Sequence, residues 1–199
     1  MTIALFDFDG TITTHETMSA FVKQSTTTRR LLIGYLYLWP MLIGYKRGIV
    51  SGQTFRAAVV RAAYKGMDKA KVDASGRTFA TQYLEKSLRP EAMERIAWHR
   101  AQGHEVAIVS GALDCYLRPW AEKYQIEVIC SSLEEHNGKL TGRYKGRQCV
   151  RTEKARAVRR HFGSMTGRRV YAYGDTTEDR QLLAIATDPF YREMPTAGG

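Results

Sequence analysis

Hydrophobic residues are spaced in two ways along this chain, and the two spacings predict its elements. Short apolar runs that end in small or acidic residues predict buried strands at residues 3–6, 105–109, 127–130 and 169–173. Apolar residues at helical spacing predict helices between and after these strands, at residues 90–102, 113–124, 152–162 and 178–186. Strands that alternate with helices indicate an α/β fold with a Rossmann-like, doubly wound parallel sheet.

The stretch between the first strand and residue 90 departs from this alternation. Its spacing stays helical to residue 86, with a break at Gly66. A plain strand–helix–strand crossover needs far fewer residues. We therefore expect an all-helical unit at 15–88, inserted after the first strand of a core domain that comprises 1–14 and 89–199.

Residues 31–45 form the most apolar part of the chain, between Arg29-Arg30 and Lys46-Arg47. The run falls short of about 18 uninterrupted apolar residues and carries Pro40 at its centre, which disfavours a membrane span. We expect buried helices of a small lobe here. An interfacial segment with aromatic rings and basic flanks is the alternative.

Composition narrows the class of protein but not its partner. Hydrophobic residues make up 44% and charged residues 25%, as in an ordinary soluble globular protein. The net charge of +10 implies attraction to anions such as phosphorylated metabolites, acidic lipid headgroups or nucleic acid, unless the basic surface only confers solubility. Three cysteines without CxxC spacing, and a first strand with no signal-type segment before it, favour a reducing, cytoplasmic location.

Polar side chains stand where three of the predicted strands end. Asp7 and Asp9 follow the first strand, Ser110 follows the second, and Asp175 follows the last. Strand alternation predicts that Asp7 and Asp9 point the same way. Because the carboxyl ends of parallel strands line the ligand crevice of such sheets, we expect these side chains in one pocket, with Lys154 from a helix start.

Carboxylates that converge in this way suit Mg²⁺, which also binds substrate phosphate. An aspartate can attack phosphorus to give an aspartyl-phosphate, and a second acid two residues on can protonate the leaving oxygen and then activate water. Ser110, the amides near Gly111 and Lys154 would hold the phosphoryl oxygens.

Four segments, taken in order, resemble the motifs of the haloacid dehalogenase superfamily of phosphatases. They are Asp7-Phe-Asp9-Gly-Thr11-Ile-Thr13, Val109-Ser110-Gly111, Lys154 and Gly174-Asp175-Thr-Thr-Glu-Asp179. The helical insert is similar to the small cap of subfamily IB, and the phosphoserine phosphatase branch is closest in layout. A hairpin at Asn137-Gly138, between 131–135 and 139–144, is similar to one in that branch.

The resemblance implies a role for each matching residue. Asp7 would be the nucleophile and a metal ligand, and Asp9 the general acid/base with its backbone carbonyl on the metal. Asp175 would complete the metal shell, and Asp179 would support that shell or the lysine. The phosphate-binding residues implied by the resemblance are Ser110, Gly111 and Lys154, and the substrate-binding residues are Glu16 and Arg56.

Two departures from the phosphoserine phosphatase pattern lie near the expected substrate. Glu178 stands where that branch usually has Asn, and Ala112-Leu113 follows Gly111 where Gly and Phe are typical. The aromatic segment 31–45 is similar to branch members that act on phospholipid phosphates.

Three functions follow from these observations. The first is a Mg²⁺-dependent phosphomonoesterase for a small metabolite, phosphoserine-like or otherwise amine-bearing. The second is a phosphatase of phospholipid headgroups that docks on a membrane through the basic, aromatic cap. The third, a nucleic-acid-binding module, lacks any recognisable motif, and no nucleic acid partner is expected.

Overall fold

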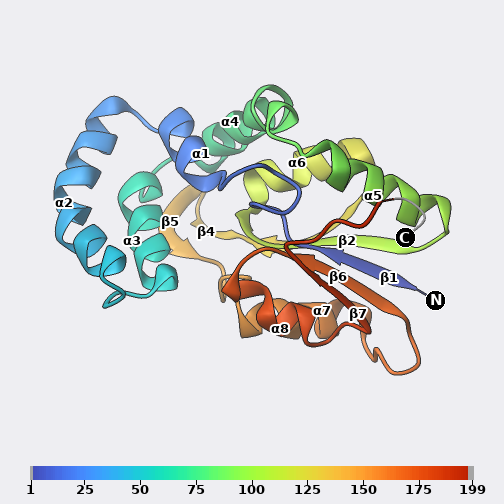
Figure 1. The fold of residues 1–199 in the computed structure, drawn as a ribbon. Helices are drawn as coiled ribbons and strands as arrows, with labels where there is room; N and C mark the ends of the chain where they lie inside the picture. Colours follow the sequence, from blue (N-terminus) through green and yellow to red (C-terminus); the bar gives the residue numbers. More distant parts are fainter. Residues whose placement is uncertain (1, 197–199) are drawn as a thin grey trace.

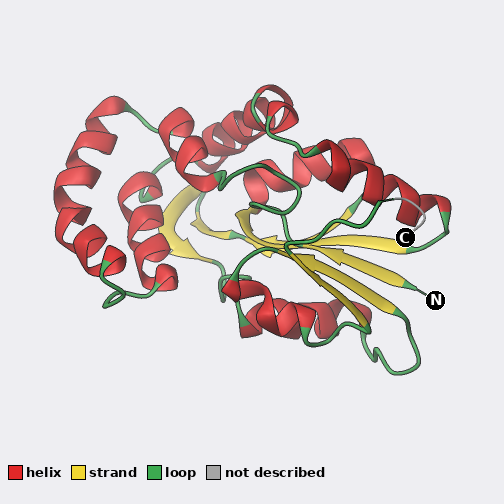
Figure 2. Ribbon diagram, viewed as in Figure 1, coloured by secondary structure: helices red, strands yellow, loops and turns green. Residues whose placement is uncertain are grey.

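The computed structural model describes residues 2–196, and a five-stranded parallel sheet forms its centre (Figures 1 and 2). The strands lie in the order β3-β2-β1-β6-β7. Their bounds are Ile3–Phe6 (β1), Glu105–Leu113 (β2), Glu127–Ser131 (β3), Val170–Gly174 (β6) and Asp188–Tyr191 (β7). β1 is the middle strand and pairs in parallel with β2 and β6. The residues that follow β1 therefore lie at the middle of the end of the sheet that the carboxyl ends of the strands form.

Helices cover both faces of this sheet (Figure 2). They are α5 (Pro90–Ala101) and α6 (Asp114–Tyr124) on one face, and α7 (Thr152–Phe162) and α8 (Arg180–Leu183) on the other. Side chains of β1 alternate between the two layers: Ala4 and Phe6 pack with the first, and Ile3 and Leu5 with the second. The predicted α/β class with a parallel, doubly covered sheet is confirmed.

Four helices and a short 3-10 turn occupy the stretch between β1 and α5. They are α1 (Met18–Ser25), α2 (Thr28–Lys46), α3 (Gly52–Tyr64), α4 (Lys69–Gln82) and η1 (Leu84–Lys86). The rings of Phe21, Tyr64 and Phe79 pack together, and Phe21 also contacts Tyr116 of α6 at 4.8 Å between centroids. The helical segment and the sheet therefore share one continuous apolar core.

The predicted hairpin is present as β4 (Leu133–His136) and β5 (Lys139–Tyr144). Its turn residues Asn137 and Gly138 have positive φ (50° and 74°), which explains the Asn-Gly pair. β5 packs on α3 so closely that a Cβ on Gly142 would lie 2.8 Å from the Cβ of Lys65. The hairpin thus packs against the helical segment through the contact of β5 with α3.

The carboxyl-terminal part differs from the prediction. The long helix expected at 178–186 is a 3-10 turn (Thr177–Asp179) followed by the four-residue α8, and the strand β7 after it was not predicted. The reason is tertiary: Thr187 exchanges hydrogen bonds with Val170, which draws the following residues into the sheet beside β6. β2 is also longer than expected, because it continues past Ser110 to Leu113.

The prediction of buried helices at 31–45 is wrong. The segment lies in a single helix, α2, which continues through Pro40 and has only Gly34 buried. α2 packs on α3 along one side and stands at the far edge of the molecule in Figure 1, where no further layer covers it. Across residues 2–196, no helix has the length and apolar character needed to cross a membrane.

Candidate active site

Asp7 directly follows the central strand β1 and lines a cavity at the carboxyl ends of the parallel strands. Its N–H donates to the carbonyl of Tyr173 on β6 (2.9 Å), which fixes the backbone, and its carboxylate accepts a hydrogen bond from Lys154. The residue is buried. Burial raises the pKa of Asp7 to about 7, against the opposing effect of the Lys154 charge.

Lys154 comes from the first turn of α7 and is itself buried. Its ammonium donates to Asp7 and to Asp179 (2.6 Å), so one cation joins two carboxylates. Burial alone would lower the pKa of Lys154, but the two carboxylates outweigh it and the pKa is raised. The lysine therefore stays charged beside Asp7.

Asp179 holds the far side of this arrangement. Its second oxygen accepts hydrogen bonds from the backbone N–H groups of Asp175 (3.3 Å) and Thr176 (3.0 Å), and from the Thr176 hydroxyl (2.9 Å). Gly174 permits this approach, since a Cβ there would lie 2.5 Å from the Cβ of Asp179. The loop after β6 is thereby tied to Lys154 and, through it, to Asp7.

Asp9 lines the same cavity as Asp7 but is held by a different element. Its carboxylate accepts hydrogen bonds from the N–H (3.0 Å) and hydroxyl (2.7 Å) of Thr17, at the start of α1. Burial, and then the charge of Glu16, raise the pKa of Asp9 to about 8. A carboxyl in this environment keeps its proton near neutral pH, which suits a general acid.

The geometry near Asp7 fits a hard cation. Carboxylate oxygens of Asp7, Asp175 and Asp179 lie within 4.8 Å of one another. Gly10 has φ of +80°, and a Cβ there would lie 2.3 Å from a carboxylate oxygen of Asp175, so the main chain after Asp9 approaches this group closely. An all-oxygen donor set of this kind suits Mg²⁺.

Two of the expected ligands, Asp7 and Asp175, belong to this acidic cluster, and Asp179, which also bonds Lys154, is its third member. Asp9 was expected to offer its backbone carbonyl, which stays a prediction, and its carboxylate is turned toward Thr17. Thr11 was not anticipated: its hydroxyl donates to Asp175 (3.3 Å). Burial raises the pKa of Asp175, with a further contribution from the charge of Asp179.

Ser110 and Gly111 lie within β2 near its carboxyl end, and they line the same cavity as these carboxylates. The Ser110 hydroxyl accepts a hydrogen bond from the N–H of Ala112 (3.1 Å). A Cβ on Gly111 would lie 2.7 Å from Val150, so only glycine fits between the strand and the chain that leads into α7. Both residues face the cavity that Asp7 faces.

One cavity of about 320 Å³ brings the predicted residues together. Asp179 is not part of the wall and supports it from behind through Lys154 and the 175–176 backbone. The predicted residues that line the cavity are Asp7, Asp9, Glu16, Arg56, Ser110, Gly111, Lys154 and Asp175. His15, Arg89 and Thr176 also line it and were not anticipated.

Glu16 and Arg56 reach the cavity with partners of their own. The carboxylate of Glu16 accepts hydrogen bonds from the N–H groups of Met18 (2.8 Å) and Ser19 (3.2 Å), so it caps α1. One guanidinium nitrogen of Arg56, Nη2, donates to both carboxylate oxygens of Glu178 (2.9 and 3.0 Å). Arg56 is in α3 and Glu178 follows β6, so this ion pair connects the helical segment to the core.

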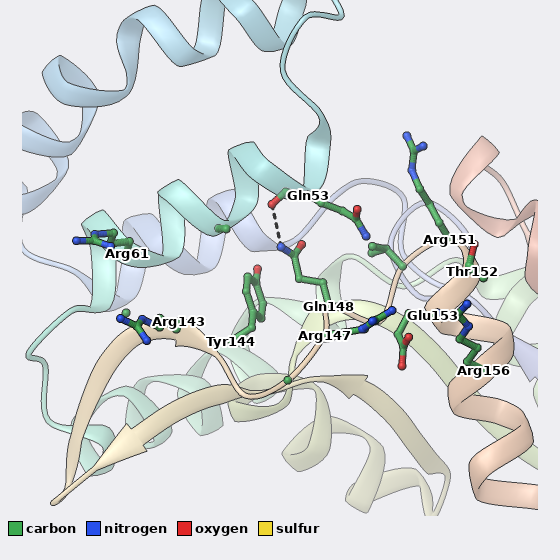
Figure 3. Close-up of a pocket in the computed structure, with 14 residues that line it drawn as sticks. Gln53, Arg61, Arg143, Tyr144, Arg147, Gln148, Arg151, Thr152, Glu153 and Arg156 are labelled. Carbon is green, nitrogen blue, oxygen red and sulfur yellow. Dashed lines mark hydrogen bonds between the residues drawn. The ribbon is translucent and has the colours of Figure 1, made fainter.

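Gln148 extends that connection. It accepts a hydrogen bond from Arg56 (3.3 Å) and donates one to the carbonyl of Gln53 (2.8 Å, dashed in Figure 3). Neither Gln148 nor Thr17 was predicted as a site residue. No sequence signal marks them, because their partners Arg56 and Asp9 are recognised only once the chain has folded.

A basic groove of about 720 Å³ lies beyond this connection, between α3, β5 and the start of α7. Figure 3 shows Arg61 and Arg143 toward one end and Arg147 and Arg156 toward the other. It shares Val150 with the wall of the acidic cavity, and Arg151 at its rim approaches Glu178 at 3.7 Å. The groove, lined by several arginines, and the cavity, lined by several carboxylates, are therefore neighbours.

The fold and the site define an α/β enzyme whose carboxylate-lined cavity lies at the carboxyl ends of a parallel sheet. A family model described as haloacid dehalogenase-like hydrolase matches residues 4–184. The chain belongs to this family of hydrolases, and the expected family is confirmed.

Similar proteins agree in sequence and in fold. Protein CicA of Caulobacter vibrioides is 33% identical over 196 residues, covering 96% of this chain and 85% of that protein. A Bordetella pertussis protein of unknown function has a TM-score of 0.76 at 20% identity, with 96% of this chain and 90% of that chain covered. A phosphoserine phosphatase solved as a phospho-aspartyl intermediate analogue has a TM-score of 0.65 at 20% identity, with 96% and 85% covered.

Proposed function

We propose that this protein is a Mg²⁺-dependent phosphomonoester hydrolase that works through an aspartyl-phosphate on Asp7. The observation that carries the proposal is the placement of Asp7, Asp9 and Lys154 around one cavity. The family match, and the likeness of the fold to a phosphoserine phosphatase with a phospho-aspartyl analogue, support it. In this proposal residues 1–14 and 89–199 form the core domain, and residues 15–88 form a cap above its cavity.

In the first half-reaction, a carboxylate oxygen of Asp7 attacks phosphorus while the bond from phosphorus to the ester oxygen breaks. Asp9 gives its proton to that leaving oxygen, and the alcohol departs. The raised pKa of Asp9 favours the protonated form that this step needs. Lys154 and Ser110 hold the phosphoryl oxygens while charge is redistributed.

In the second half-reaction, Asp9, now ionised, accepts a proton from water. The water oxygen attacks phosphorus, the bond from phosphorus to Asp7 breaks, and inorganic phosphate leaves. Thr17 holds the Asp9 carboxylate in the orientation that both steps need.

Asp7 and Asp175, together with the carbonyl of Asp9, would hold Mg²⁺, and Asp179 would orient the loop that carries Asp175. When bound, the cation supplies positive charge that offsets the neighbouring carboxylates and the substrate phosphate.

A phosphate-release screen with and without Mg²⁺ tests the proposal. It should include phosphoamino acids, sugar phosphates, nucleotides and phospholipid phosphates. We expect at least one of these to be turned over with Mg²⁺ and none with EDTA. Turnover that is the same in EDTA, or no turnover of any phosphomonoester, would contradict the proposal.

A small amine-bearing substrate such as phosphoserine needs Glu16 and Arg56, and each of these already has protein partners. A second candidate, a phosphatase of phospholipid headgroups, is favoured by one observation: most of the exposed large apolar side chains among the described residues lie on the helical segment, in α2. Competition between a soluble and a vesicle-borne phosphomonoester, measured by phosphate release, separates the two candidates.

A further inference from the structure

Helix α2 exposes more apolar surface than a water-facing helix usually carries. Large apolar side chains that are about half exposed or more follow one another along it and just beyond its end. They are Leu32, Ile33, Tyr35, Leu36, Tyr37, Trp39, Tyr45 and Ile49, and Leu36 and Tyr37 are 76% and 77% exposed. An apolar patch of this kind on a folded protein marks an interaction surface.

Charge around this helix is one-sided. No Asp or Glu occurs between Glu16 and Asp68, although the same stretch carries eight lysines and arginines. Two cations stand at each end of the apolar run, Arg29 and Arg30 before it and Lys46 and Arg47 after it. The partner of this surface must therefore combine an apolar interior with negative charge at its border.

A second copy of the chain does not meet that requirement. Because both ends of α2 are cationic, a helix pair in either direction would place cations of one copy against cations of the other. α2 itself contains no carboxylate that could relieve the repulsion.

The border between the headgroups and the acyl chains of an anionic bilayer does meet it. Tyr and Trp side chains, four of which are exposed on or beside α2, favour that border, and lysines and arginines at the flanks reach the phosphates. An apolar groove of about 190 Å³ between α2 and α3 opens beside the same helix and is lined by Leu38, Trp39 and Phe55 among others.

We infer that α2 docks the protein on an anionic lipid bilayer, lying in the plane of the interface with its apolar side chains among the upper acyl chains. The contact of α2 with α3 holds the helix along the surface of the protein. The inference concerns the helical segment alone and does not depend on the proposed catalytic activity.

The test is co-sedimentation of the full chain with vesicles, read as bound protein rather than as turnover. One set of vesicles is phosphatidylcholine, and the other contains about one quarter phosphatidylglycerol. We expect binding to the anionic vesicles that is at least about tenfold tighter than to the neutral ones, because each cation near the surface adds to the attraction. A blue shift of Trp39 fluorescence should accompany binding and disappear in Trp39→Phe.

Two variants separate the apolar and electrostatic contributions. Leu36→Ser with Tyr37→Ser should weaken binding by about tenfold or more. Arg29→Gln with Lys46→Gln and Arg47→Gln should remove the preference for anionic vesicles. Arg30 is left in place because its guanidinium holds the carbonyls of Ala63 and Lys65, both at 3.0 Å.

Control variants make changes of the same chemical type elsewhere in the chain. Tyr191→Ser removes an exposed tyrosine from β7, and Lys71→Gln with Arg77→Gln removes two cations from α4. Both controls should bind vesicles as the unaltered protein does. Three results would overturn the inference: no binding to either vesicle, equal loss in the controls, or a dimer in light scattering that Leu36→Ser with Tyr37→Ser dissociates.

Discussion

The end of β1 and helix α2 lie close together in sequence, and both depart from the usual distribution of side chains, in which charged groups are exposed and apolar groups are buried. At the end of β1, charged groups are inside: Asp7 and Lys154 are both buried. On α2, apolar groups are outside, with Leu36 and Tyr37 more than three-quarters exposed. The difference is that each buried charge has a protein partner, whereas Leu36 and Tyr37 of α2 are left mostly uncovered by the rest of the protein.

Both arrangements point to something outside the chain, but they do so at different cost. A buried carboxylate cluster loses hydration and is stabilised by a cation that enters the cavity. An exposed apolar helix gains free energy when its apolar side chains move from water into an apolar medium. Substitutions at the end of β1 should therefore affect catalysis and stability, and substitutions of the exposed apolar side chains of α2 should affect neither.

The largest effect is expected at Asp7. Asp7→Asn removes the nucleophile and should reduce phosphate release by at least about a thousandfold, since the attacking oxygen is lost. Vesicle binding through α2 should be unchanged in the same variant. Turnover close to that of the unaltered protein would refute the role of Asp7, provided that circular dichroism shows an intact fold.

The next effect is a loss of stability at Lys154. Lys154→Met fills similar space but leaves Asp7 and Asp179 buried without their cation, which costs about 3–5 kcal/mol. Urea unfolding of the metal-free protein measures it. Arg77→Met, on the exposed face of α4, is the matched control and should change stability by less than about 0.5 kcal/mol. Equal losses of stability in the two variants would show that the buried contacts of Lys154 with Asp7 and Asp179 add no stability beyond that of an exposed residue.

An effect of comparable size, spread over several pH units, concerns Asp9. Its folded-state pKa, raised to about 8, means that its contribution to stability is present at low pH and is lost as pH rises from about 4 toward 8. In EDTA, the unaltered protein should therefore lose stability relative to Asp9→Asn by about 1 kcal/mol per pH unit over that window. The difference should level off above about pH 8, and parallel pH curves for the two proteins would contradict the shift.

The smallest effect on stability is expected on α2 itself. Leu36→Ser with Tyr37→Ser should change the free energy of unfolding by less than about 0.5 kcal/mol, because both side chains are mostly exposed already. Hydrolysis of a soluble phosphomonoester should also be unchanged. A large destabilisation would show that these α2 side chains pack more tightly than their exposure indicates. It would contradict the expected difference in stability effect between α2 and the end of β1.

Much of the fold followed from local patterns in the sequence. The apolar run of β1, the helix at 152–162 and the Asn137-Gly138 hairpin are each specified by short-range signals, and each is present. β7 and the shortened α8 were missed because hydrogen bonds between Thr187 and Val170, seventeen residues apart in sequence, decide them.

The error at α2 has a different cause. Apolar residues at 31–45 predict burial only if the chain supplies a partner layer, and here it supplies α3 along one side alone. Sequence hydropathy cannot tell a side chain that faces a protein layer from one that faces an external medium.

At the site, the sequence identified the residue types but not their pairing. Asp7, Asp9, Ser110, Lys154 and Asp175 were expected in one pocket, and they line one cavity. The ion pair of Arg56 with Glu178 joins residues 122 positions apart, and no spacing rule predicts it. Roles for Glu16 and Arg56 toward substrate stay predictions.

Transfer of the phosphoryl group to Asp7 is tested most directly by chemical trapping. The protein is mixed with a turned-over phosphomonoester and Mg²⁺, quenched in acid and treated with borohydride, which reduces an aspartyl-phosphate to homoserine. Mass spectrometry of the peptides should find homoserine at position 7, and none in samples with EDTA or in Asp7→Asn. Steady phosphate release with homoserine at another aspartate, or at none, would contradict the account.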